Sequence, residues 1–126
     1  MVDIREQSPL ALAFVGDAVY SLAVREYLVT DKRYQINTLN KMTVQYVSAK
    51  GQFAAFELIK DILDEKELDM VRRGKNTSKA SVAKHASVEE YRTSTCLECL
   101  FGYLKLTNQD DRIKYLVDYI MKNLTF

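Results

Sequence analysis

Residues 9–28 read PLALAFVGDAVYSLAVREYL, and this stretch decides the fold. Ser8 and Pro9 form a typical helix start, in which a hydroxyl N-cap is followed by proline at the first helical position. A helix through these residues would be apolar on nearly every side. Such helices are buried, so we predict a central helix that ends near Leu28.

The middle of the chain also has a helical pattern. Residues 30–37 are polar and are expected to form a loop. Residues 38–63 predict one long helix or two, with a break between Ser48 and Gly51. A capping-box spacing at Asp64 and Glu67 then predicts a short helix.

The last third of the chain predicts two more helices. The short helix ends near Arg73, and residues 72–85 are expected to form an exposed basic loop. Ser87 and Glu90 form a second capping box, which begins a helix through about Leu106. Asn108 is expected to cap the last helix. One apolar stripe of that helix consists of Ile113, Leu116, Val117, Ile120 and Leu124.

These elements predict an all-α fold, a single domain of about six helices over residues 1–126. The composition is 48% hydrophobic and 28% charged, which excludes a disordered chain. The best apolar run is interrupted by Asp17, so no membrane-spanning segment is expected. The first nine residues lack the pattern of a signal peptide, and we expect a cytoplasmic protein.

Two acidic residues stand alone in apolar surroundings. Asp17 is the one charged residue between Ser8 and Val24, and Glu98 is the one charged residue between Thr93 and Leu104. Small residues surround both, which would let the two helices cross closely with both acids at the crossing. A buried carboxylate needs a partner, because desolvation of an unpaired charge is costly.

The partner of these acids has two interpretations. Each acid could be a core carboxylate bound to a hydroxyl, a backbone N–H or an arginine. Alternatively, the pair could bind a hard divalent cation such as Mg²⁺, which prefers carboxylate oxygens and acidifies bound water. Periodicity alone leaves both interpretations open.

Positive charge is concentrated in residues 72–85, which hold five Lys or Arg and no acid. The rest of the chain has 13 basic and 17 acidic residues. We expect this segment to contact RNA phosphates rather than to be only a solvated basic surface. The candidate RNA-binding residues are Arg72, Arg73, Lys75, Asn76, Lys79 and Lys84, whereas His85 is expected to be only a loop residue.

The cysteines and aromatic residues have less specific interpretations. Cys96 and Cys99 form a C-x-x-C motif, which could be a redox pair or half a zinc site, but their spacing favours two small core residues on one helix face. Aromatic residues at helical core positions are expected to pack inside: Phe14, Phe53, Phe56 and Tyr103.

The stretch over residues 9–28, with its G-D-A-V, resembles the signature helix of ribonuclease III domains. Residues 93–106, TSTCLECLFGYLKL, resemble the later helix of that family, in which a glutamate precedes an apolar pair and a glycine. The segments RRGKN at 72–76 and YRTST at 91–95 are similar to the Mini-III branch, which lacks a double-stranded-RNA-binding domain. The resemblance covers nearly the whole chain.

This resemblance implies that Asp17 and Glu98 are the catalytic, metal-binding acids, with Mg²⁺ as cofactor and Mn²⁺ as a substitute. Two further acids of full-length ribonuclease III fall on Ala13 and Thr95 here. Their loss favours a site with few protein ligands. The resemblance also implies a homodimer, to which Phe14 could contribute.

The expected activity is hydrolysis of double-stranded RNA to leave a 5′-phosphate, with 23S ribosomal RNA precursor as the expected substrate. An accessory ribosomal protein is a further expected partner. Two alternatives remain: an RNA-binding protein of this fold that has lost turnover, and an all-helical module that binds an acidic protein partner.

Overall fold

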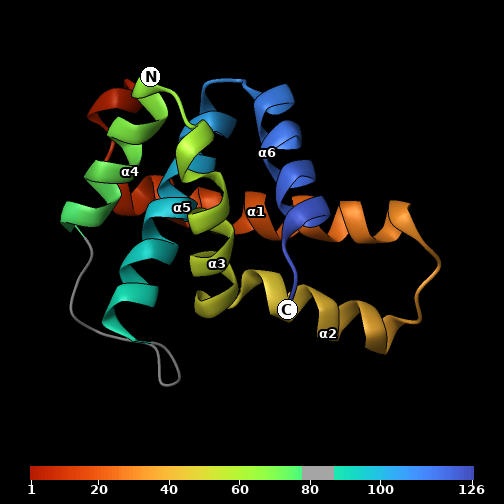
Figure 1. Ribbon diagram of the computed structural model, residues 1–126. Helices are drawn as coiled ribbons and strands as arrows, with labels where there is room; N and C mark the ends of the chain where they lie inside the picture. Colours follow the sequence, from red (N-terminus) through yellow and green to blue (C-terminus); the bar gives the residue numbers. More distant parts are fainter. Residues whose placement is uncertain (78–86) are drawn as a thin grey trace.

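The computed structural model describes residues 1–77 and 87–126, and all regular structure within them is helical (Figure 1). This confirms the predicted all-α fold. The six α-helices of the described residues are α1 (Pro9–Asp31), α2 (Ile36–Val47), α3 (Ala49–Ile59), α4 (Glu65–Thr77), α5 (Val88–Leu106) and α6 (Asp110–Asn123). Two short 3₁₀ turns are η1 (Ile4–Glu6) and η2 (Lys60–Ile62).

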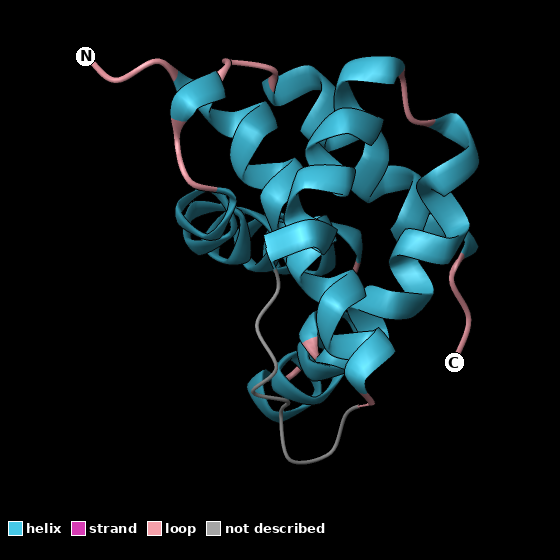
Figure 2. Cartoon of the chain, turned by 90° about the vertical axis from the view of Figure 1, so that its left-hand side faces the viewer, coloured by secondary structure: helices cyan, strands magenta, loops and turns pink. Residues whose placement is uncertain are grey.

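Helix α5 is the centre of the domain. It begins with the predicted capping box, in which Ser87 accepts from the Glu90 N–H and the Glu90 carboxylate accepts from the Ser87 N–H. From Ser94 to Leu104 it is buried except at Glu98. It packs against α1, α3, α4 and α6, which cover its buried stretch (Figure 1). The side view shows the same all-helical arrangement (Figure 2).

Helix α1 crosses α5 with the two backbones in direct contact. A Cβ atom added to Gly16 would lie 1.5 Å from the carbonyl oxygen of Glu98. A Cβ atom added to Gly102 would lie 1.9 Å from the carbonyl oxygen of Leu12. No side chain fits at either position, so these two glycines set the separation of the helices.

The break predicted between Ser48 and Gly51 is present. Helix α2 ends at Val47, and the Ser48 hydroxyl accepts from the Gly51 N–H at 3.1 Å to begin α3. The turn is tight, because a Cβ atom on Gly51 would lie 1.9 Å from the Gln45 carbonyl oxygen. Residues 36–59 therefore form two helices.

The predicted end of the short helix at Arg73 is wrong, because α4 continues to Thr77. Gly74 does not end it. This glycine is buried against α5, and a Cβ atom there would lie 3.1 Å from Cys99 Cβ and 3.2 Å from Cys96 Cα. The absence of a side chain lets the two helices pack closely, and the basic segment therefore begins on a helix.

The prediction that Asn108 caps the last helix is also wrong. Asn108 has a φ of 58°, a left-handed conformation that asparagine adopts more readily than most residues. Gln109 is the N-cap of α6, and its side chain makes no capping bond. The predicted stripe is correct, because Ile113, Leu116, Val117 and Ile120 are buried and Leu124 is half-buried.

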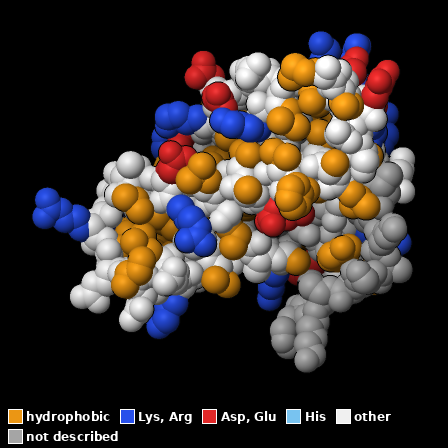
Figure 3. All heavy atoms as spheres, turned by 180° about the vertical axis from the view of Figure 1, so that it is seen from behind, with side chains coloured by type: hydrophobic (Ala, Val, Ile, Leu, Met, Phe, Trp, Pro, Cys, Tyr) orange, Lys and Arg blue, Asp and Glu red, His pale blue; other side chains and the backbone are white. Residues whose placement is uncertain are grey.

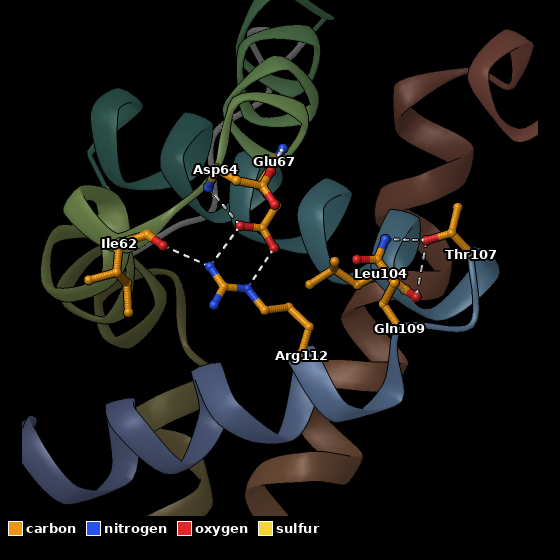
Figure 4. A network of polar contacts seen from close by, with 7 residues as sticks. All are labelled: Ile62, Asp64, Glu67, Leu104, Thr107, Gln109 and Arg112. Atoms are coloured by element: carbon orange, nitrogen blue, oxygen red, sulfur yellow. Dashed lines mark hydrogen bonds and ion pairs between the residues drawn. The ribbon is translucent and has the colours of Figure 1, made fainter.

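A buried ion pair fixes α4 to α6 (Figure 4). The guanidinium of Arg112 donates to both carboxylate oxygens of Glu67, at 2.8 and 2.9 Å, and to the Ile62 carbonyl at 2.7 Å. Glu67 also accepts from the Asp64 N–H, which completes the predicted capping box of α4. This network holds the start of α4 in place.

None of the described helices combines the length and the hydrophobicity that a membrane span requires.

We predict that Gly16→Ala and Gly102→Ala each destabilise the fold by about 3 kcal/mol or more, because the added methyl overlaps backbone atoms that cannot move separately. The measurement is urea denaturation of each variant. Gly74→Ala is the matched control and is expected to cost less, since its nearest neighbours lie at 3.1 Å or beyond. Equal stability of all three variants would contradict the close crossing.

Candidate functional site

The crossing of α1 and α5 brings the two lone acids together. Asp17 directly follows Gly16 on α1, and the backbone of Glu98 is the part of α5 that Gly16 contacts. Asp17 is exposed and Glu98 is half-buried, so the expectation of two buried carboxylates holds only in part. We call this pair the acidic centre. Glu98 is on its side toward the protein interior, and Asp17 is on the side open to solvent.

The electrostatics of the pair follow from this geometry. The pKa of Glu98 is raised to about 7, chiefly by burial and to a smaller extent by the negative charge of Asp17 and a side-chain hydrogen bond with it. A hydrogen bond from Gln52 acts in the opposite direction. Two carboxylates held this closely repel each other when both are ionised.

Neither acid is neutralised by a basic side chain. Among residues 1–77 and 87–126, no ion pair involves Asp17 or Glu98. In the same ranges no group of three or more His, Cys, Asp or Glu is arranged to hold a metal ion. The acidic centre thus supplies two carboxylates, which are oxygen ligands of the kind that Mg²⁺ prefers.

A third polar side chain, which the sequence analysis missed, reaches this centre from α3. The amide nitrogen of Gln52 donates to Glu98 Oε2 at 3.2 Å and to the Val47 carbonyl at 2.9 Å. Gln52 lies 46 positions from Glu98, and no local pattern marks it. Only the packing of α3 against α5 brings it to the acid.

Ala13 and Thr95 stand where full-length ribonuclease III has two further acids, and neither residue replaces the missing carboxylate. Ala13 is buried on α1, and Thr95 is buried on α5. The Thr95 hydroxyl donates to the Tyr91 carbonyl at 3.1 Å, a bond within its own helix. Neither position supplies a carboxylate to the acidic centre.

The candidate RNA-binding residues separate into three groups. Arg72, Lys75 and Asn76 are exposed on α4, a helix rather than the expected loop. Arg73 is half-buried, and its guanidinium donates to the Gln7 carbonyl at 3.0 Å, which ties α4 to the N-terminal segment. Lys79, Lys84 and His85 lie outside the described residues.

The expectation that Phe14 packs inside is wrong, because its side chain is 83% exposed. Leu10 and Leu22 on the same helix are also exposed, at 40% and 58%. Their spacing of four and eight residues from Phe14 places all three on one face of α1, with Ala18 between them. We call these four residues the α1 stripe.

The face of the molecule on which α1 lies is shown in two of the figures. Helix α1 lies behind α3 and α5 in Figure 1, and the view from behind shows hydrophobic side chains across the middle of that face, with acidic side chains among them (Figure 3). Of the other aromatic residues predicted to pack, Tyr103 is buried, and Phe53 and Phe56 are half-buried.

The cysteines are core residues, as predicted. Cys96 and Cys99 are buried and unbonded to each other. Burial raises the pKa of both thiols to about 11, so they are protonated at neutral pH. Protonated, buried thiols are poor metal ligands and poor nucleophiles. Their burial agrees with the core role that their spacing predicts.

Comparison with known proteins identifies the family of this arrangement. The family model described as "Ribonuclease III domain" matches residues 10–109, which include both acids. The chain is 45% identical to a Mini-ribonuclease 3 of Thermoanaerobacter sp. over 88% of this chain and 78% of the relative. It is 40% identical to a Mini-ribonuclease 3 of Enterococcus faecalis over 98% of this chain and 96% of the relative.

A solved structure shares the fold. The crystal structure of protein FN1578 from Fusobacterium nucleatum superimposes with a TM-score of 0.86 and 34% sequence identity. The match covers 97% of this chain and 98% of that chain. The similarity therefore extends over the whole helical arrangement, beyond the two short motifs.

Proposed function

The chain belongs to the ribonuclease III family, in its Mini-ribonuclease 3 branch, and on that basis we propose that it hydrolyses double-stranded RNA with Asp17 and Glu98 as its catalytic acids. The observation that carries the proposal is the meeting of these two acids, without a basic partner among the described residues, at the crossing of α1 and α5. Two carboxylates that lie this close without a basic neighbour form the kind of oxygen site to which a divalent cation binds.

The donor set fits a divalent cation. Two carboxylates and the amide oxygen of Gln52, which has no hydrogen-bond partner, are hard oxygen donors that suit Mg²⁺. When bound, Mg²⁺ would acidify a water molecule and neutralise charge on the scissile phosphate. Asp17 is on the exposed side of the centre, so its carboxylate is accessible to substrate. Glu98 is held from within by Gln52.

Exposed positive charges on α4 support duplex RNA as the substrate. Helix α4 packs against α5, the helix that carries Glu98, and it exposes Arg72, Lys75 and Asn76 to solvent. Lysine and arginine on one surface bind phosphates with little sequence preference, as recognition of an A-form helix requires. We propose that this reaction leaves a 5′-phosphate on one of the two RNA ends.

We extend the proposal to 23S ribosomal RNA precursor as substrate and to a homodimer in which two acidic centres face opposite strands. The α1 stripe supports the dimer, because a helix face with an 83% exposed Phe14 is typical of an interaction surface. Asp17 lies beside Ala18 of this stripe, so a partner there would place two centres near each other.

We predict that Asp17→Asn and Glu98→Gln each lower the cleavage rate of a long RNA duplex in Mg²⁺ by at least about 100-fold, with the fold retained. Removal of either charge leaves a single carboxylate for the cation. The measurement is gel analysis of cleaved RNA, with circular dichroism as the check on folding. If the wild type and Asp17→Asn leave equal amounts of intact RNA, the protein binds RNA without turnover.

We predict that Arg72→Ala combined with Lys75→Ala weakens duplex binding. The steepness of log affinity against log salt should also fall by about 2, because binding of the variant neutralises two fewer phosphates and so releases fewer counterions. Binding is measured by filter retention at several salt concentrations. Lys41→Ala combined with Lys122→Ala, which removes two exposed charges elsewhere, is the matched control. An unchanged slope for the α4 variant would exclude this helix from the RNA interface.

We predict that Phe14→Glu converts the protein from dimer to monomer in sedimentation equilibrium, because a charge would be buried at the centre of the α1 stripe. Val44→Glu is the matched control, since Val44 is 60% exposed on α2 and lies outside the stripe. A wild-type monomer, or a Phe14→Glu variant that is still a dimer, would show that this face does not join two copies.

A further inference from the structure

Gln52 is a buried polar residue whose side chain is only partly paired by hydrogen bonds. It is 3% exposed and sits one turn into α3, at the point where that helix meets α5. Both of its hydrogen bonds use the amide nitrogen, one to Val47 and one to Glu98. The side chain therefore connects the turn between α2 and α3 to the acidic centre.

The orientation of this amide is determined by its neighbours. The Val47 carbonyl is an acceptor whatever the protonation state of Glu98, so the contact at 2.9 Å requires the NH₂ group. Exchange of the amide nitrogen and oxygen would place oxygen against oxygen. The assignment of Nε2 to these two contacts is thus set by chemistry, and Oε1 must point elsewhere.

That oxygen, Oε1, is the one buried side-chain polar atom of the described residues without a hydrogen-bond partner. Buried acceptors are almost always paired, so each exception needs a reason. The two N–H bonds are explained by a structural role, in which Gln52 links the turn between α2 and α3 to α5. That role does not explain the unpaired oxygen.

We propose that Gln52 is the third side chain of the cation site. Its amide N–H groups fix the Glu98 carboxylate, and its amide oxygen is a neutral donor to the bound cation, directly or through a water molecule. The inference rests on the proposed function, and it supplies from α3 an oxygen that Ala13 and Thr95 do not provide. Amide oxygens are common ligands of hard divalent cations.

An amide fits this position better than a third acid. A carboxylate at position 52 could not donate to the Val47 carbonyl, and it would add a third negative charge beside Asp17 and Glu98. Glutamine provides both a donor for the turn and an oxygen for the cation, without that repulsion.

The test measures binding of Mn²⁺ alone, by the electron paramagnetic resonance signal of the free ion, so that catalysis is not needed. We expect Gln52→Met to weaken Mn²⁺ binding about ten-fold relative to the wild type. Gln52→Glu keeps a side-chain oxygen at this position and adds a negative charge, so it is expected to lower the stability of the metal-free protein but to bind Mn²⁺ at least as tightly as the wild type. Gln35→Met is the matched control, because Gln35 is exposed and its side chain makes no capping bond.

The outcomes separate this inference from the proposed function. If the wild type binds Mn²⁺, Asp17→Asn does not, and Gln52→Met binds as the wild type does, the acidic centre stands and the role of Gln52 is overturned. If Asp17→Asn binds as tightly as the wild type, the cation site itself is wrong. If Gln52→Met does not fold, Gln52→Glu decides, and a ten-fold weaker affinity of that variant overturns the inference.

Discussion

The backbone contact between Gly16 of α1 and Gly102 of α5 is the constraint on which the other features depend. It brings two helices from distant parts of the chain so close that no side chain fits between them. Because Asp17 follows Gly16 and the Glu98 backbone lies against Gly16, the contact determines where both carboxylates lie. Electrostatic repulsion alone would separate two like charges. The free energy that holds them together comes from burial of the apolar helices α1 and α5.

Other contacts hold supporting groups around this crossing. The Glu67–Arg112 ion pair fixes the start of α4, and Gly74 lets α4 lie closely against α5, the helix that carries Glu98. The turn at Ser48 starts α3 and places Gln52 against Glu98. Two helices besides α5 thus meet at the acidic centre: α1 with an acid and α3 with an amide.

Features that are local in sequence could be predicted from it. The capping boxes at Asp64–Glu67 and Ser87–Glu90, the break at Ser48 and the stripe of α6 all depend on residues within one or two turns of each other. Predictions failed where tertiary contacts decided the outcome. Gly74 resembles a helix end but serves a close packing contact, and Phe14 has the periodicity of a core residue but lies on an open face. Gln52 was missed because its partner is 46 residues away.

The central claim is that Asp17 and Glu98 hold a divalent cation at the crossing of α1 and α5. The most direct measurement is an anomalous difference map from crystals of the protein soaked in Mn²⁺. We predict a peak within bonding distance of both carboxylates. A map with no peak there, or carboxylates that have turned to a lysine or arginine instead, would contradict the claim.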